Sequence, residues 1–316
     1  MKITVILCTY NRCQILVKAL DGVAGQMLPE SDEWEVLVVD NNSSDQTHDV
    51  VRDFCQRYPG RFRYLFEAQQ GLSHARNAGI REAQGDVLVF VDDDVNTTPM
   101  WLQHLTNPLR NGKYAGAGGR ILPEWTCPPP AWLPIEGSYA LAPFAVFDLG
   151  PEASRLFEPP FGASMAFQKK LFARYGYFRT DLGRCGTAML CNEDTEFGRR
   201  LLKAGEVLYY EPSAVVYHPV SQDRLQKNYL LKWRFSKGRS DIREFGPRAG
   251  TRYSVRGVPL YMFRYLARGI VCWMLVLDPR QRFQNKLEVW GTLGAIVECF
   301  HASEAAPHGW ESNASK

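Results

Sequence analysis

Short apolar runs alternate with amphipathic stretches over the first ninety residues of the chain. Four runs predict buried strands: ITVILC (3–8), WEVLVVD (34–40), RFRYLF (61–66) and DVLVFVD (86–92). Helical patterns lie between them, at residues 12–26, 43–58 and 71–85. This alternation predicts an α/β fold with a mostly parallel sheet flanked by helices. Ligands of such sheets bind beyond the carboxyl ends of the strands.

The pattern changes after the fourth strand. Residues 123–160 are rich in proline and aromatic residues, which predicts an irregular segment long enough to be a binding loop. Residues 191–205 then predict a helix, and residues 206–219 predict one or two strands. From Asp223 to Arg256 there are ten basic residues against three acidic ones. An apolar, helical stretch follows to about residue 300, so we expect a C-terminal helical extension.

Composition narrows the class of protein. A net charge of +3 over 316 residues argues against a general nucleic-acid binder. The eight cysteines form no C-x-x-C pair, which is typical of reduced thiols. The first residues lack the pattern of a signal peptide, and Arg264 and Arg268 interrupt the longest apolar stretch. We therefore expect a cytoplasmic protein, and contact with the inner face of the plasma membrane stays open.

Three consecutive carboxylates, Asp92, Asp93 and Asp94, follow the fourth apolar run. Like charges at this spacing should raise one another's pKa. Asp92 and Asp94 can turn toward one point, and carboxylates are the ligands that Mg²⁺ and Mn²⁺ take in proteins. Asp40 ends the second run, so it should lie at the same edge of the sheet. The alternative is a solvated acidic turn before a helix that begins near Pro99.

Six motifs extend this picture. They are VILCTYNR, VVDNNSSD, GLSHARNAGI, FVDDD, GASMAF and NEDTEFGRRLLKAG. In this order they resemble the family 2 glycosyltransferases, and the match covers roughly residues 1 to 220. The resemblance implies a GT-A (Rossmann-like) fold and an enzyme that uses nucleotide-activated sugars. Processive members carry Q-x-x-R-W and spanning helices, whereas this chain has YLLKWRFSKGR, which indicates a non-processive bacterial type.

The resemblance also implies roles for single residues. The positions implied to bind the nucleotide-sugar are Thr9, Tyr10, Arg12, Asp40, Arg76, Asn77, Asp92 and Asp93. The implied metal ligands are Asp92, Asp94 and His218, and the implied acceptor site contains Gly162, Ala163 and Ser164. Asp194, with Glu193, is the implied catalytic base. Structural alternatives stay open for several of them. Asp40 or the acid pair could cap a helix, Asn77 could satisfy backbone groups, and His218 could be a hydrogen-bonded residue at a strand end. Arg76 could pair with a surface carboxylate.

We therefore expect a GT-A catalytic domain over residues 1–220 and a basic, amphipathic helical region over 221–316. Within the first, residues 1–120 should bind the nucleotide-sugar and 121–220 the acceptor. The implied reaction is an inverting, metal-dependent transfer from a nucleotide-diphosphate sugar, with a bias toward UDP, to a hydroxyl of a carbohydrate or lipid-linked saccharide. A bacterial surface or exopolysaccharide pathway is the usual setting of the family.

Other functions remain as alternatives. A nucleotidyltransferase of sugar phosphates would need a glycine-rich, lysine-containing loop after the first strand, where this chain has CTYNR. A phosphatase with a D-x-D-x-T/V motif would need Thr or Val at Asn96. A non-catalytic carbohydrate-binding protein would not need both acid pairs.

The basic stretch from Arg224 has three interpretations. It is a solvated helix face, it folds over the active site to bind diphosphate, or it contacts anionic lipid headgroups. The apolar helix expected over residues 258–277 could lie in a membrane interface or pack on the catalytic domain. The sequence does not decide between them.

Overall fold

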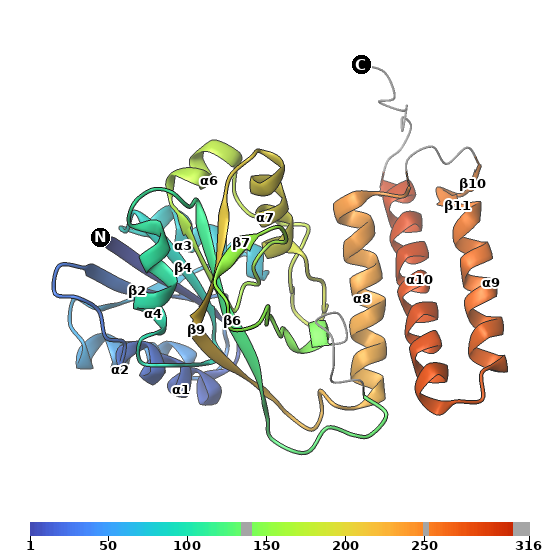
Figure 1. Cartoon of the computed structure of the whole chain (residues 1–316), viewed down its shortest axis with the longest axis horizontal. Helices are drawn as coiled ribbons and strands as arrows, with labels where there is room; N and C mark the ends of the chain where they lie inside the picture. Colours follow the sequence, from blue (N-terminus) through green and yellow to red (C-terminus); the bar gives the residue numbers. More distant parts are fainter. Residues whose placement is uncertain (134–140, 249–252, 306–316) are drawn as a thin grey trace.

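The computed structural model describes residues 1–133, 141–248 and 253–305. Nine strands form one mixed sheet with helices on both faces (Figure 1). Its order is β3-β2-β1-β4-β8-β6-β9-β5, and β7 pairs with β9. The strands are β1 (Lys2–Thr9), β2 (Glu33–Asp40), β3 (Phe62–Phe66), β4 (Val87–Asp92), β5 (Asn96–Thr97), β6 (Gly116–Trp125), β7 (Ser154–Leu156), β8 (Ser164–Gln168) and β9 (Leu208–Val220).

The first four strands confirm the βα alternation. β1 pairs in parallel with β2 and with β4, and β2 pairs in parallel with β3. Successive residues Val5, Ile6 and Leu7 are all buried, so both faces of β1 are covered. The covering helices are α1 (Cys13–Ala24), α2 (Thr47–Arg57) and α3 (Leu72–Glu82).

The second half of the sheet differs from the prediction of a mostly parallel sheet. β8 lies antiparallel between β4 and β6, whereas β6 and β9 are parallel. β5 and β7 each pair antiparallel with β9. Apolar runs identify strands but leave their direction open, because the connections set it. The helices of this half are α4 (Trp101–Thr106), α6 (Lys170–Tyr175) and α7 (Glu193–Lys203), with short 3₁₀ turns at Asn107–Leu109 and Ala142–Phe144.

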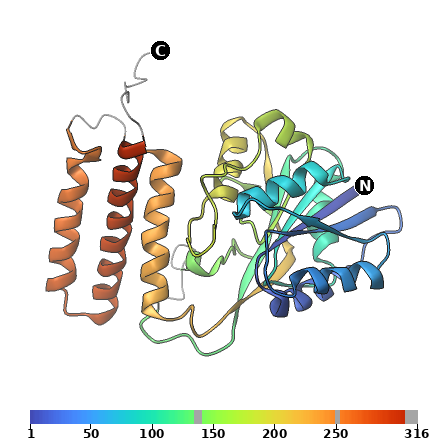
Figure 2. The same ribbon diagram turned by 180° about the vertical axis from the view of Figure 1, so that it is seen from behind.

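Three long helices follow the sheet. They are α8 (Lys227–Phe245), α9 (Leu260–Leu275) and α10 (Pro279–Ala305), and a small hairpin of β10 (Ser254–Val255) and β11 (Val258–Pro259) precedes α9. α10 lies between α8 and α9 (Figures 1 and 2). Glycines allow close approach here, since a Cβ on Gly294 would collide with the carbonyl of Phe235. Arg239 and Arg243 of α8 pair with Glu298 of α10 at 2.8 and 2.6 Å.

The packing of α9 decides one of the open alternatives. α9 packs on α10, and α8 and α10 separate it from the sheet (Figure 2). The interpretation that this helix packs on the catalytic domain therefore does not match the structure, in which α9 packs on α10 and β11. Trp273 lies edge-on to Trp290 of α10, with ring centroids 6.0 Å apart. No helix within the described ranges is long and apolar enough to cross a membrane.

Candidate active site

A cavity of about 930 Å³ lies where β1 and β4 end. Its other walls come from residues 142–163, from the start of α7 and from α8. The position beyond the carboxyl ends of parallel strands is the one predicted from the sequence. The cavity brings together most of the predicted site residues: Thr9, Tyr10, Arg12, Arg76, Asp92, Asp93, Asp94, Gly162, Ala163, Glu193, Asp194 and His218.

The three aspartates do not form a simple repelling cluster. Asp94 Oδ2 accepts hydrogen bonds from Arg224 at 2.9 Å and from Arg12 at 3.1 Å, and its Oδ1 lies 3.5 Å from His218 Nε2. Burial raises the pKa of Asp94, but the charges of His218, Arg224 and Arg12 outweigh it and lower the pKa to about 2.

Asp93 shows the opposite shift. Burial is the main cause that raises its pKa to about 6, and the nearby charge of Asp94 adds to it. Arg12 opposes the rise and donates a hydrogen bond to Asp93 at 2.7 Å. The expectation that the three acids raise one another's pKa therefore fails at Asp94, because basic residues distant in sequence fold against it.

Arg76 connects the two groups of acids. It donates from Nη1 to Glu193 at 2.6 Å and from Nη2 to Asp92 at 3.2 Å. Its side chain is only 4% exposed, so the alternative of a surface ion pair is wrong. Gly162 is required beside it, because a Cβ there would collide with the guanidinium. One buried cation thus fixes the end of β4 against the start of α7.

Glu193 and Asp194 begin α7 and face the cavity in different environments. Burial, with the charge of Asp194, raises the pKa of Glu193 to about 7, against the opposing effect of Arg76. Asp194 accepts hydrogen bonds from the backbone N–H of Gly162 at 2.6 Å and of Thr195 at 2.7 Å. These two donors fix the orientation of its carboxyl group.

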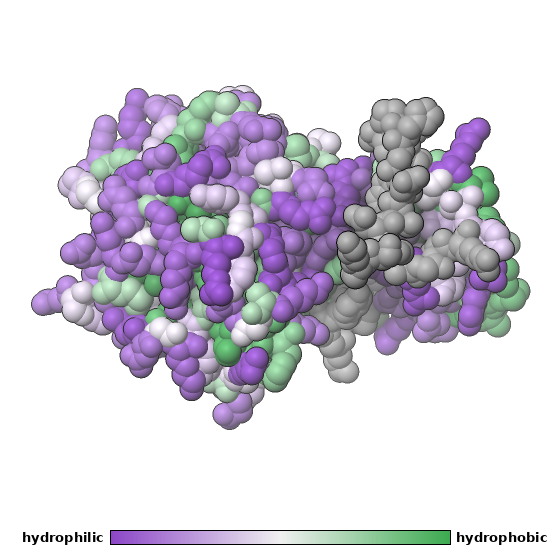
Figure 3. Space-filling view, turned by 90° about the horizontal axis from the view of Figure 1, so that it is seen from above, coloured by the Kyte–Doolittle hydropathy of each residue, from purple (hydrophilic) through white to green (hydrophobic). Residues whose placement is uncertain are grey.

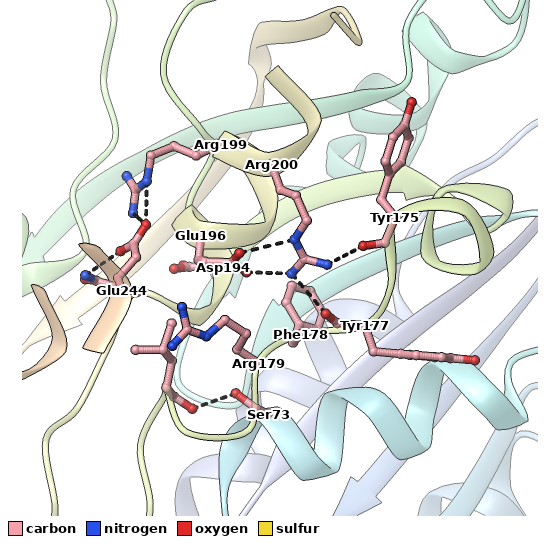
Figure 4. Close-up of polar contacts among 12 residues, drawn as sticks. Ser73, Tyr175, Tyr177, Phe178, Arg179, Asp194, Glu196, Arg199, Arg200 and Glu244 are labelled. Atoms are coloured by element: carbon pink, nitrogen blue, oxygen red, sulfur yellow. Dashed lines mark hydrogen bonds and ion pairs between the residues drawn. The ribbon is translucent and has the colours of Figure 1, made fainter. Parts of the chain in front are cut away.

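The rest of α7 carries two arginines that have acidic partners of their own. Arg200 pairs with Glu196 and donates to the backbone carbonyl of Tyr177, and Arg199 pairs with Glu244 of α8 (Figure 4). Glu196 and Arg200 thus form an ion pair outside the cavity, whereas Glu193 and Asp194 on the same helix line the cavity. The ion pair fixes the helix that carries the two acids.

Three predicted site residues do not line the cavity. Asp40 accepts from the backbone N–H of Ser43 and from the hydroxyl of Tyr64, both at 2.9 Å, so both of its oxygens have partners. The amide of Asn77 exchanges two hydrogen bonds with the backbone of Phe178, as the structural alternative predicted. Ser164 is fully buried and accepts from the indole N–H of Trp101.

Several polar residues of the cavity wall were not predicted from the sequence. Arg184, Arg199, Lys237, Asn41 and Gln70 line it from five separate segments. The basic stretch from Arg224 was a usable signal, since Arg224, Arg234 and Lys237 all reach the cavity. The isolated residues gave no pattern, because only the folded loops bring them together.

The side chains that line the cavity show whether a divalent metal ion fits this site. Over the described ranges, no three His, Cys, Asp or Glu side chains are grouped to hold a metal ion, and Asp92 faces Arg76. Asp94 and His218 nevertheless offer a carboxylate oxygen and an imidazole nitrogen side by side. Burial is the main cause that lowers the pKa of His218, and the charge of Asp94 opposes it; the neutral imidazole is the form that can bind a metal ion. Two protein ligands completed by substrate phosphates are a usual way to bind Mg²⁺.

Comparisons with known proteins agree with this geometry. A family model described as glycosyl transferase family 2 matches residues 4–157. The glucosyl-dolichyl phosphate glucuronosyltransferase of Haloferax volcanii is 26% identical over 244 residues, which are 76% of each chain. The succinoglycan biosynthesis protein ExoM of Rhizobium meliloti is 26% identical, over 77% of this chain and 74% of that protein.

Two solved structures share the fold. A mannosyltransferase of Pyrobaculum calidifontis, in complex with GDP-Man and Mn²⁺, superposes with a TM-score of 0.56 and 19% identity, over 97% of this chain and 76% of that one. GalNAc-T7 with UDP, GalNAc and Mn²⁺ superposes with a TM-score of 0.54 and 16% identity, over 80% of this chain and 53% of that one. The chain has the GT-A fold and belongs to glycosyl transferase family 2.

Proposed function

We propose that this glycosyltransferase adds one sugar, with inversion, from a nucleotide-diphosphate sugar to a hydroxyl of a saccharide acceptor. One observation carries the proposal: Arg76 pairs with Asp92 at the end of β4 and with Glu193 at the start of α7, and both groups of acids line one cavity. Donor binding needs polar groups at the strand ends, and displacement needs a base on the other side of the sugar. The cavity of about 930 Å³ is large enough for both substrates.

On the donor side, Thr9 and Tyr10 at the end of β1 and Arg12 would contact the nucleotide. Asp94 and His218 would hold a divalent cation, Mn²⁺ or Mg²⁺, which when bound neutralises charge on the leaving diphosphate. The Mn²⁺ in both neighbouring structures supports this assignment. We infer a UDP-linked donor, as one of those structures contains UDP.

On the acceptor side, Asp194 is the proposed general base. As the acceptor oxygen bonds to the anomeric carbon, the bond from that carbon to the diphosphate breaks, and the diphosphate leaves with its electron pair. The proton of the acceptor hydroxyl passes to the carboxylate. Each carboxylate oxygen of Asp194 accepts one backbone N–H, which leaves lone pairs for that hydroxyl. Glu193, paired with Arg76, would position the helix start.

The acceptor would lie against Gly162 and Ala163. The names of two relatives, a succinoglycan biosynthesis protein and an enzyme of glucosyl-dolichyl phosphate, support a saccharide or lipid-linked acceptor. The succinoglycan biosynthesis relative supports a pathway for bacterial surface or exopolysaccharide.

We also propose peripheral contact with an anionic membrane through α9. This helix is at the outer edge of the molecule, where apolar residues gather (Figure 3). Met274, Leu275 and Leu277 are 69%, 74% and 93% exposed. Arg264 and Arg268 on the same helix are also exposed, and such a combination favours an interface with anionic lipid.

A nucleotide-sugar panel tests the proposed function. Thermal unfolding is recorded with each nucleotide diphosphate and Mn²⁺, and hydrolysis of each nucleotide-sugar is measured in parallel. We expect UDP to raise the melting temperature and a UDP-sugar to be hydrolysed slowly. If no nucleotide diphosphate shifts melting with any divalent metal, the donor site is assigned wrongly.

A further inference from the structure

Two guanidinium groups converge on one oxygen of Asp94. Arg12 divides its contacts between Asp93, at 2.7 Å, and Asp94, at 3.1 Å. Arg224 donates to the same oxygen of Asp94 at 2.9 Å. Arg224 and Asp94 are each 13% exposed at the side chain, so this is a largely buried ion pair inside the cavity.

Arg224 also lies against the neighbouring imidazole. Its Nη1 is 3.4 Å from both ring nitrogens of His218, and Asp94 Oδ1 is 3.5 Å from His218 Nε2. The guanidinium therefore spans the two side chains that offer metal donors. A divalent cation bound between Asp94 and His218 would adjoin this fixed positive charge, and the two cations would repel each other.

Arg224 can give way because it lies in a connection. It follows the end of β9 at Val220 and precedes α8, which begins at Lys227. Its backbone is held by a hydrogen bond to the carbonyl of Ser221, and Leu225 beside it is buried. The backbone thus holds Arg224 in place, and its long side chain with several rotatable bonds is the part that can move.

We propose that Arg224 is the counter-ion of Asp94 in the metal-free enzyme and moves to the diphosphate of the donor when a metal ion takes Asp94. This role rests on the proposed function, which it deepens. A guanidinium fork matches phosphate oxygens, so the displaced charge gains a new partner only when the nucleotide is present. Metal and nucleotide then bind better together than either binds alone.

Removal of the guanidinium should change the two affinities in opposite directions. In Arg224→Gln, Mn²⁺ alone binds several-fold more tightly, because Arg12 is then the one guanidinium of this pair that still competes for Asp94. UDP in saturating Mn²⁺ binds about tenfold more weakly, because one charge-assisted contact to phosphate is lost. If Arg224 had a purely structural role, the substitution would weaken the binding of Mn²⁺ and of UDP together, or would change neither affinity.

The experiment titrates the full chain with Mn²⁺ alone, by electron paramagnetic resonance of the free ion, and with UDP in saturating Mn²⁺, by calorimetry. Arg120→Gln is the matched control, since Arg120 forms an equally short pair with Asp148 that does not line the cavity. It should change neither affinity. Arg224→Lys keeps the charge, so Mn²⁺ binding stays near wild type while UDP binding weakens.

The outcomes are distinct. Opposite changes in Arg224→Gln support the counter-ion role. If the wild type binds Mn²⁺ and UDP but the two affinities of Arg224→Gln move together or not at all, the role is wrong. If the Gln variant does not fold, unchanged UDP binding in Arg224→Lys overturns it. If the wild type binds neither Mn²⁺ nor UDP, the proposed function fails and this role with it.

Discussion

The edge of the sheet and α9 differ in the kind of side chain they carry. The edge of the sheet contains buried charged side chains, whereas α9 presents exposed apolar ones. Around the cavity, the side chains of Arg76 and Glu193 are 4% and 7% exposed and pair at 2.6 Å. At the other end of the molecule, Leu275 and Leu277 are 74% and 93% exposed. Both arrangements are unfavourable for an isolated fold, because buried ions lose hydration and exposed apolar side chains order water. We infer that each is kept for a ligand: polar substrates at the first, lipid at the second.

α8 connects these two regions. Arg224 just before it contacts Asp94, and Lys237 lines the cavity. On its other side α8 packs on α10, which carries α9. If the comparison is right, changes at the sheet edge alter chemistry and nucleotide binding, while changes on α9 alter only membrane contact.

The largest effect is expected at Asp194. Asp194→Asn is nearly isosteric and can keep one of the two accepted hydrogen bonds, but it cannot take a proton, so turnover should fall by on the order of 10²–10⁴-fold. Affinity for UDP with Mn²⁺ should stay within a few fold. Steady-state kinetics on the true acceptor measure turnover, and calorimetry measures the affinity for UDP.

A matched control for this variant is Glu196→Gln, an acid on the same helix that pairs with Arg200 outside the cavity (Figure 4). It should retain near-normal turnover. If Asp194→Asn keeps its activity while Glu193→Gln loses it, the base is Glu193 and our assignment is wrong.

The next effect concerns Asp94. Asp94→Asn should abolish the dependence of UDP affinity on Mn²⁺, because the carboxylate that holds the metal is lost. Its native pKa of about 2, against an ordinary value of 3.8, means that it stabilises the fold above pH 4 and loses that contribution as the pH falls toward 2. The variant should therefore also be less stable at neutral pH, by about 2 kcal/mol.

Calorimetry of UDP with and without Mn²⁺ checks the metal dependence of UDP affinity. Urea unfolding at pH 7 checks the loss of stability. Asp148→Asn, which removes the partner of Arg120 outside the cavity, is the control and should leave the metal dependence intact. A variant that still gains UDP affinity from Mn²⁺ would remove Asp94 from the metal site.

A smaller effect is expected on α9. Changing Met274 and Leu275 to Asp removes exposed apolar surface and adds negative charge, so sedimentation with anionic liposomes should fall by about tenfold. Hydrolysis of the nucleotide-sugar should not change. Ile15→Asp alters a 51%-exposed apolar residue of α1 and should leave sedimentation as it is. Equal loss in both variants would exclude α9 as the specific contact.

The last effect, which leaves the substrates and the membrane unaffected, is a pH dependence of stability. Glu193 has a native pKa of about 7 and an ordinary value of 4.5, so the folded state binds more protons between these values. Its contribution to stability is full below pH 4.5 and is lost as the pH rises through 7. Glu193→Gln should flatten this decline in unfolding free energy, whereas the surface variant Glu33→Gln should not. A decline that persists in Glu193→Gln would assign it to other groups.

The sequence predicted the strands and acids of the first half well, because buried strands leave continuous apolar runs such as residues 87–91. Asp92 and Asp94 were found because a polar cluster directly after such a run is conspicuous. The place of β8 between β4 and β6 was not predictable, since pairing direction depends on connections that leave no periodic pattern.

Partners distant in sequence account for the remaining differences. Asp40 was expected to face a ligand; in the structure it accepts a hydrogen bond from the hydroxyl of Tyr64 on the neighbouring strand and does not line the cavity. Arg224 was part of a basic stretch with three open interpretations, and only folding places it on Asp94. Composition indicated that this stretch carries charge, whereas the choice of partner required the tertiary structure.

The most direct test of the central claim is the stereochemistry of slow donor hydrolysis. The nucleotide-sugar that the panel identifies is incubated with the enzyme and Mn²⁺, and proton NMR follows the first anomer released, before mutarotation. An inverting transfer in which one base opposes the leaving diphosphate predicts that this anomer has the configuration opposite to the donor. Retention of configuration, or no release of sugar with any nucleotide-sugar, would contradict the account.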